Sequence, residues 1–396
     1  MTAFTTSDDP RTELAQRLPV WTQPIISWIS GAPAPGETYR ARAPFEPVID
    51  AVARMAVGVG LSVAGLGALL TSPGLALLLL FMGAVLTVSG MGIVQVVVFH
   101  YCGHDAVFRD RARNLGVGRA ISVLFAFKYF DHYRREHIQH HRAQKLITEE
   151  DEFASFVIKV CGMRPGMSQA MLWARLCLIL VSPAFHLKFL RLRIVGNFPR
   201  ENRRHGALFV AFWTLLLAMV AATGVWIEFL VAWVLPLTVL LQAATIFRIL
   251  CEHRFPDARL LAVRGKALIA EATTGVFAAK RPPVRGDVDA MNFARWALWW
   301  LDLATVQLFV RLVVLVGDAP AHDFHHRRPG AKTWANALHA RDLDKRSGAQ
   351  GYPSNYIDVW GLGAAIDLNI QALSAADASL LRVDAAEEPS YALLAE

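Results

Sequence analysis

The 396-residue chain is 54% hydrophobic and only 18% charged, whereas soluble domains carry about 25% charged residues. This composition is typical of a membrane protein and argues against a soluble globular domain. The net charge of +7 is compatible with a nucleic-acid partner. However, the basic residues flank apolar stretches, as the positive-inside rule predicts, and no nucleic-acid-binding motif occurs. We therefore expect an integral membrane protein that binds no nucleic acid.

Residues 1–48 are polar and proline-rich, which predicts an N-terminal cytosolic or interfacial segment. Within it, residues 14–29 mix Trp and Ile side chains with polar positions. Two interpretations are open for this piece. It is either an amphipathic segment lying along the membrane interface or a flexible tail.

Two apolar runs follow, residues 51–70 and 75–99, and the turn sequence Thr-Ser-Pro-Gly joins them. Both runs are long enough to span a membrane, because a helix needs about 20 residues to cross the hydrocarbon core. The turn carries no Lys or Arg, whereas arginines flank both outer ends of the pair. The positive-inside rule therefore places both ends of this predicted transmembrane hairpin in the cytosol.

The region 105–206 is rich in Arg and Lys and holds two apolar patches, 117–130 and 171–187. The first patch is short, and the second is interrupted by Arg175 and Pro183. Charges at membrane depth are costly. We therefore expect helices that lie on the membrane or dip into it, rather than spans.

A second predicted hairpin, residues 207–227 and 229–250, returns the chain to the cytosol. Residues 254–292 are mixed and basic and could form a lid or a loop. The run 293–316 is apolar but contains an aspartate and an arginine, so an interfacial, partly embedded helix is expected there.

Together these elements predict an all-α integral membrane protein with four transmembrane helices in two hairpins and a cytosolic helical cap. We divide the chain into the N-terminal segment 1–48, a membrane domain 49–345 and a C-terminal cytosolic tail 346–396.

Three histidine clusters are the strongest signal in the sequence. They are His100/His104, His137/His140/His141 and His322/His325/His326, and His253 stands alone after the second hairpin. Helix residues three or four apart share a face, so each cluster can point its rings in one direction. Unrelated surface histidines would rarely form three such clusters when the chain holds 13. Imidazole is a good ligand for iron, zinc, copper and nickel, and this set is too large for one tetrahedral zinc. Two metal ions held side by side would suit it.

The predicted topology and the predicted metal site constrain each other. If the two hairpins are the only spans, all clusters and His253 lie on one side of the membrane. A crossing by just one of the segments 171–187 and 293–316 would separate some histidines from the others.

The clusters resemble the signature of the membrane fatty acid desaturase family, HxxxH, HxxHH and HxxHH, and the resemblance covers roughly residues 50–340. It implies two non-haem iron ions that use O₂ and two electrons to introduce a double bond into an acyl chain or another lipid-like substrate. It also implies that His253 completes the ligand set. The predicted metal ligands are His100, His104, His137, His140, His141, His253, His322, His325 and His326.

Other functions are open. A hydroxylase could use the same iron site, although related sterol and lipid hydroxylases have their first two boxes closer together than His104 and His137 are here. A zinc-dependent membrane hydrolase would need an open metal position and a base such as Glu136. A metal transporter would place polar groups at mid-bilayer, whereas these clusters lie at the ends of predicted spans. The identity of the substrate is also open.

The electrons are expected from a separate ferredoxin- or cytochrome-type donor. No set of cysteines could hold an iron–sulfur cluster, and no GxGxxG loop indicates a fused reductase. Basic residues of the cap would steer an acidic donor, although attraction to anionic lipid explains the same charge. These residues are Arg134, Arg135, Arg142 and Lys145.

Carboxylates next to the predicted ligands could orient them, because metal-bound imidazoles usually donate their second N–H to a carboxylate or carbonyl. Adjacent helix positions point about 100° apart, so only some of these carboxylates can serve. The candidates are Asp105, Glu136, Glu252 and Asp323. The histidines that match no cluster are expected to be non-ligands, and these are His132, His186, His205 and His339.

Overall fold

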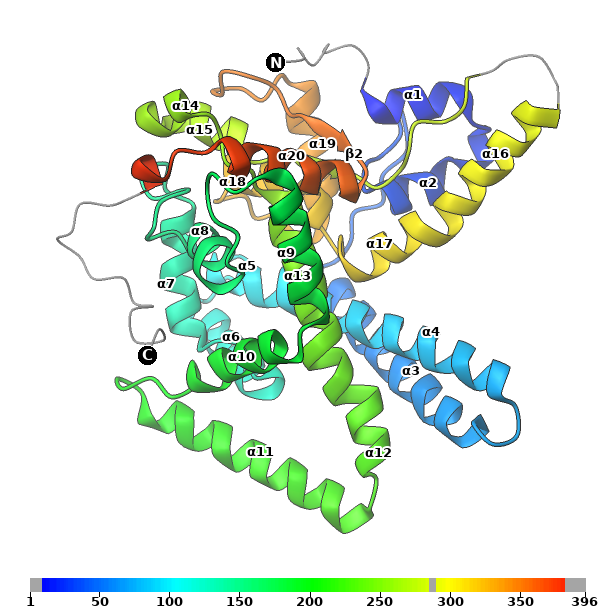
Figure 1. The fold of residues 1–396 in the computed structure, drawn as a ribbon, viewed down its shortest axis with the longest axis vertical. Helices are drawn as coiled ribbons and strands as arrows, with labels where there is room; N and C mark the ends of the chain where they lie inside the picture. The colour runs from blue at the N-terminus through cyan, green and yellow to red at the C-terminus, as the bar shows by residue number, and fades with distance from the viewer. Residues whose placement is uncertain (1–8, 285–289, 382–396) are drawn as a thin grey trace.

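The computed structural model describes residues 9–284 and 290–381, which form a mainly helical protein with one small sheet (Figure 1). The helices are α1 (Pro10–Arg17), α2 (Gln23–Ser30), α3 (Glu46–Ala68), α4 (Pro73–Ile93), α5 (His100–Gly103), α6 (Arg111–Phe125), α7 (Phe130–His140), α8 (Glu152–Ser155), α9 (Gln169–Val181), α10 (Pro183–Val195), α11 (Arg203–Thr223), α12 (Trp226–Phe229), α13 (Leu241–Glu252), α14 (Ala258–Val263), α15 (Gly265–Ala272), α16 (Ala290–Asp302), α17 (Leu308–Val313), α18 (His322–Arg327), α19 (Ala337–Arg346) and α20 (Leu362–Ala375). The strands are β1 (Gly275–Phe277) and β2 (Asp358–Trp360).

The first predicted hairpin is formed by α3 and α4, which run side by side in Figure 1. Small residues allow the two backbones to approach closely, as is common between membrane helices. A Cβ atom on Gly83 would lie 2.7 Å from the carbonyl oxygen of Gly58, and one on Gly90 would lie 2.5 Å from that of Ala51. The hairpin is thus packed along its length, and a π-helical stretch, Val94–Phe99, continues α4 into α5.

The second predicted hairpin is formed by α11 and the long helix Trp226–Glu252. Figure 1 shows α11 along the outer edge of the molecule and α13 returning to its centre. Pro236 lies within the returning helix, where a proline removes a backbone donor. Two π-helical stretches, Leu230–Val234 and Pro236–Leu240, accommodate this interruption and keep the helix continuous.

Five helices in the described residues are long and apolar enough to cross a membrane, one more than expected. Four of them are the arms of the two predicted hairpins. The fifth, Met291–Val313, includes the run that we expected to be interfacial, and it qualifies by length and composition alone. The segment 171–187 forms no straight span, because α9 and α10 meet at an angle of 72°.

The N-terminal segment is folded from Asp9 onward, which removes the flexible-tail interpretation for residues 14–29. The helices α1 and α2 pack against α16 and the π-helical stretch Leu303–Gln307 through a small apolar cluster. This cluster contains Leu14, Leu18, Ile26, Ile29, Phe277, Ala279, Trp299 and Leu303. The buried Arg311 also donates a hydrogen bond to the carbonyl oxygen of Trp28 (2.8 Å).

The sheet corrects the expectation of an all-α fold, although it is small. β1 pairs in parallel with β2, with Gly275 opposite Asp358. The segment that we expected to be a C-terminal tail supplies β2 and α20. The Asn369 side chain on α20 donates to Leu250 O (3.1 Å) and accepts from Phe255 N (3.3 Å). Residues 346–381 are therefore part of the packed body, and the rest of the predicted tail lies outside the described residues.

Candidate metal centre

The three clusters sit at helix ends that the fold brings together. His100 begins α5 at the inner end of the first hairpin, and His253 directly follows α13 at the inner end of the second. The second cluster closes α7, and the third occupies α18. The imidazoles of four chain segments that are far apart in the sequence thus lie close together in the core.

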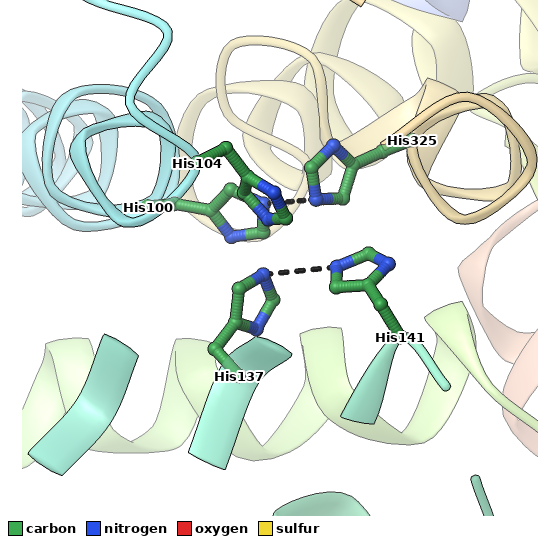
Figure 2. A group of neighbouring side chains, drawn as sticks. All are labelled: His100, His104, His137, His141 and His325. Atoms are coloured by element: carbon green, nitrogen blue, oxygen red, sulfur yellow. Dashed lines mark hydrogen bonds between the residues drawn. The ribbon is translucent and has the colours of Figure 1, made fainter. Parts of the chain in front are cut away.

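Five of the predicted ligands form a first group, in which the candidate ligand atoms all lie within 4.8 Å of one another. Its members are His100, His104, His137, His141 and His325. Figure 2 shows these rings converging from three sides. The Nε2 atoms of His100 and His325 are 2.6 Å apart, and those of His137 and His141 are 3.0 Å apart.

The other four predicted ligands form a second group with the same spacing limit, made of His140, His253, His322 and His326. The Nε2 atom of His253 lies 2.9 Å from that of His140, 3.0 Å from that of His326 and 3.2 Å from that of His322. His253 therefore joins the clusters, although it has no motif of its own. The second and third clusters each contribute to both groups.

Burial favours neutral imidazole in both groups, which is the form that binds a metal. Burial, together with the charges of Arg134 and Lys332, lowers the pKa of His104 to about 4. Burial and the neighbouring imidazoles also hold the pKa of other members well below the usual value. These are His137, His141, His322, His325 and His326. Two protonated rings at these distances would repel each other, so neutral rings suit this geometry.

His140 differs because it has a carboxylate partner. Its Nδ1 atom lies 2.6 Å from Oδ1 of Asp151, which is fully buried. Burial alone would lower the pKa of His140, but the charge and hydrogen bond of Asp151 raise it. Asp151 is held in turn by the backbone N–H groups of Ile147 and Phe153. This carboxylate fixes the ring so that Nε2 faces His253.

A second buried carboxylate, Asp323, belongs to α18, the helix that carries the third cluster. Asp323 is fully buried and accepts two hydrogen bonds from the guanidinium of Arg341, at 2.7 and 2.6 Å. Arg341 also pairs with Asp358 on β2 (2.8 Å), and Lys345 pairs with Asp358 as well. Burial alone would raise the pKa of Asp358, but these cations lower it. The buried ion network links α18, α19 and the sheet.

The other carboxylates proposed from sequence have different surroundings. Oε1 of Glu252 approaches Nδ1 of His322 at 4.0 Å, beyond hydrogen-bond distance, and Arg248 lies 4.0 Å from its other oxygen. Asp105 pairs with Arg134 at 2.7 Å. Glu136 forms an ion pair with Lys128.

The four remaining histidines lie outside both groups. His132 contacts Glu201, and His205 contacts Asn197. His186 contacts Gln242, and the ring of His339 stacks on that of Tyr39. Each therefore has a local partner unrelated to the nine clustered rings.

The residues of both groups fit a pair of transition-metal ions. Nine imidazoles offer ring nitrogens at close range, and imidazole suits iron as well as zinc, copper and nickel. A neutral imidazole carries a single N–H, so facing rings cannot satisfy all nitrogens. The buried Nε2 atom of His104 has no hydrogen-bond partner among the described residues. A bound cation would give these ring nitrogens the partner that the surrounding residues do not supply.

The long apolar helices are those of an integral membrane protein. The two groups of histidines at their inner ends form a candidate site for two metal ions. A family model described as Fatty acid desaturase matches residues 73–279, half of the chain, and the protein belongs to this family. The match confirms the resemblance found in the sequence and identifies an oxidoreductase. It ends before the third cluster, which the geometry nevertheless joins to the others. No curated protein matches the sequence.

Proposed function

We propose that this protein is an O₂-dependent membrane oxidoreductase with two iron ions, which introduces a double bond into an acyl chain or another lipid-like substrate. One observation carries the proposal: nine imidazoles from three clusters and His253 gather in two adjoining groups. The fatty acid desaturase family match supports the same reading. Iron and zinc both accept imidazole, so the family is the reason for preferring iron.

Within this proposal, two iron ions supply the O₂-dependent oxidation of an unactivated C–H bond. The chain holds them with His100, His104, His137, His141 and His325 in the first group, and with His140, His253, His322 and His326 in the second. Asp151 orients His140, and the Arg341–Asp323 pair braces the helix that carries the third cluster. Burial of the second group excludes water from its side of the centre.

Chain continuity supports a four-span layout with the clusters on one side. His140 and His253 belong to one group, so the segment between them must cross the bilayer an even number of times. The helices α11 and Trp226–Glu252 supply two crossings, which leaves the bent pair α9–α10 as a re-entrant element. His253 and His322 also share a group, and Met291–Val313 is the only candidate span between them in the described residues. We therefore assign that helix to the membrane interface.

The surroundings of Met291–Val313 fit an interfacial position. Asp302 pairs with Lys280 at 2.6 Å, and Trp299 Nε1 donates to the carbonyl oxygen of Lys280 (2.9 Å). The rest of the helix exposes apolar side chains, among them Phe293 (77%), which lies opposite Asp302, and Leu301 (58%). A helix with one polar, packed face and one exposed apolar face suits the boundary between water and lipid. The positive-inside rule then places the clusters on the cytosolic side.

Electrons would enter at the first group. Its His104 and His141 are half-buried, whereas the other seven clustered histidines are buried. Beside His104, Arg134 pairs with Asp105 (2.7 Å) and Lys332 donates to the carbonyl oxygen of Asp105 (2.9 Å).

Arg111 also approaches Asp105, at 3.9 Å. Three cations around Asp105, two at its carboxylate and one at its carbonyl oxygen, leave a positive surface next to the least buried part of the centre. This charge suits a separate acidic donor of the ferredoxin or cytochrome type, because complementary charge steers association.

Expression of the full chain with a ferredoxin and its reductase, followed by lipid and metabolite profiling, tests the proposal. A product two hydrogens lighter than its substrate, formed only with O₂ and the donor, supports desaturation. A product heavier by one oxygen identifies a hydroxylase. One zinc per chain and hydrolysed lipid would replace the proposal with a zinc hydrolase.

A further inference from the structure

A groove runs along the outer face of α11, away from the histidines. Its volume is about 910 Å³, and the loop Phe198–Arg200 and the exposed side of α11 line it. Small side chains, including Ala207, Ala211 and Ala218, form its floor. From Arg203 to Ala218 the floor extends for roughly 22 Å, given a helical rise of 1.5 Å per residue. One leaflet of hydrocarbon is about 15 Å thick, so the groove is long enough for an acyl chain.

The two ends of the groove differ in charge. Arg200 and Arg203 line one end, and both are exposed. Among residues 9–284 and 290–381, neither arginine forms an ion pair. The nearby Glu201 is instead paired with His132 and Arg135.

The same end coincides with the N-terminus of α11, where the side chain of Asn202 caps the helix by accepting from His205 N. The first N–H groups of a helix have no acceptor within the helix, and together with the helix dipole they favour an anion. The rest of the groove is lined mainly by apolar side chains. An amphiphile with a negative headgroup matches both parts.

The helix α11 is also largely exposed. It is a candidate span of 21 residues, and only 17% of its apolar window is buried. Its inner side is fixed by few contacts, such as the hydrogen bond from Trp213 Nε1 to the carbonyl oxygen of Val123 (2.9 Å). In Figure 1, α11 is the outermost helix of its hairpin. Lipid therefore covers the grooved side in a bilayer.

We infer that this groove is a binding site for one anionic phospholipid of the surrounding membrane. Its phosphate lies at Arg200, Arg203 and the first turn of α11, and one acyl chain lies over Ala207, Ala211 and Ala218. The lipid fills the outer side of α11 and stabilises the second hairpin. The inference is independent of the metal ions and of the reaction that they support.

Native mass spectrometry of the full-length protein with phosphatidylglycerol and phosphatidylcholine tests the site. We expect one retained phosphatidylglycerol, bound about tenfold more tightly than phosphatidylcholine, because each basic residue near a phosphate adds attraction. The double variant Arg200→Gln/Arg203→Gln removes this preference. The matched control is Arg204→Gln, which removes the same charge from the next helix position outside the groove lining.

A second variant tests the acyl part. Ala211→Trp places a large side chain on the exposed floor and should weaken both lipids while Arg200 and Arg203 remain. Phosphatidylglycerol should also raise the Tm of the wild type more than that of either variant. Equal affinity for the two lipids, an equal loss in Arg204→Gln, or unchanged binding by Ala211→Trp would each overturn the inference.

Discussion

His140 and His253 are separated by 113 positions in the sequence, yet their Nε2 atoms lie 2.9 Å apart. One ring closes the helix α7, and the other directly follows the last arm of the second hairpin. The distance between these two atoms therefore depends on the whole hairpin folding and returning to the same side. His253 can therefore be a ligand of the second group only if both arms of the second hairpin cross the membrane.

Replacing His253 tests this role. His253→Ala removes the residue whose Nε2 atom lies within 3.2 Å of all three partners in the second group. We expect about half of the wild-type iron and no measurable turnover, because the first group keeps its five imidazoles. Metal analysis of the purified protein measures the first effect. His132→Ala, which lies outside both groups, is the control and should keep all iron. Full iron content in His253→Ala would exclude it as a ligand.

Asp151 is expected to tune the affinity of the second group. Asp151→Asn keeps the shape of the side chain but removes the charge that holds His140. Loss of such a partner lowers metal affinity by about 10–100-fold. A chelator competition assay at constant pH measures the change.

The neighbouring variant Glu150→Gln serves as a control, because Glu150 pairs with Lys145 and not with a clustered histidine. If both variants retain metal equally well, Asp151 has no role in positioning His140.

Arg341 is expected to be important for stability. Arg341→Met leaves Asp323 and Asp358 buried without their shared cation, and such changes cost about 3–5 kcal/mol. Arg346→Met instead breaks a more exposed ion pair with Asp342 and should cost less than about 1 kcal/mol. Denaturant unfolding in detergent compares the two. Similar losses from both variants would show that the buried network is unimportant.

The metal-free protein should lose stability on acidification. Burial holds the pKa of His104 at about 4, whereas an unfolded histidine titrates near pH 6.5. Between these values the unfolded chain binds more protons than the folded chain, so the free energy of unfolding falls as the pH falls. Above about pH 6.5 this histidine contributes no pH dependence. The Tm of chelator-treated protein at pH 7.5 and pH 5 measures the trend, and a Tm that is higher at pH 5 would contradict it.

The two hairpins were predictable because length and hydropathy suffice to identify a span. The eight histidines of the three clusters were predictable because their spacing places each cluster on one helix face. His253 was reached through the family resemblance alone, since a single histidine has no spacing. The structure brings all nine residues together, which the sequence pattern could only suggest.

Other features depend on contacts that a local pattern does not contain. Asp151 stands in the acidic run 149–152, and nothing in the run distinguishes it from its neighbours. The strands β1 and β2 have three residues each, too short for a period-two signal. Residues 346–381 were assigned to a tail because their packing partners lie far away in sequence, as Asn369 and Leu250 illustrate.

The most direct test of the proposed function is the iron content of the purified, full-length protein together with the mass of its product. We predict two irons per chain and a lipid-like product that has lost two hydrogens, formed only when O₂ and an electron donor are present. One zinc per chain, or a product formed equally well without O₂, would contradict it.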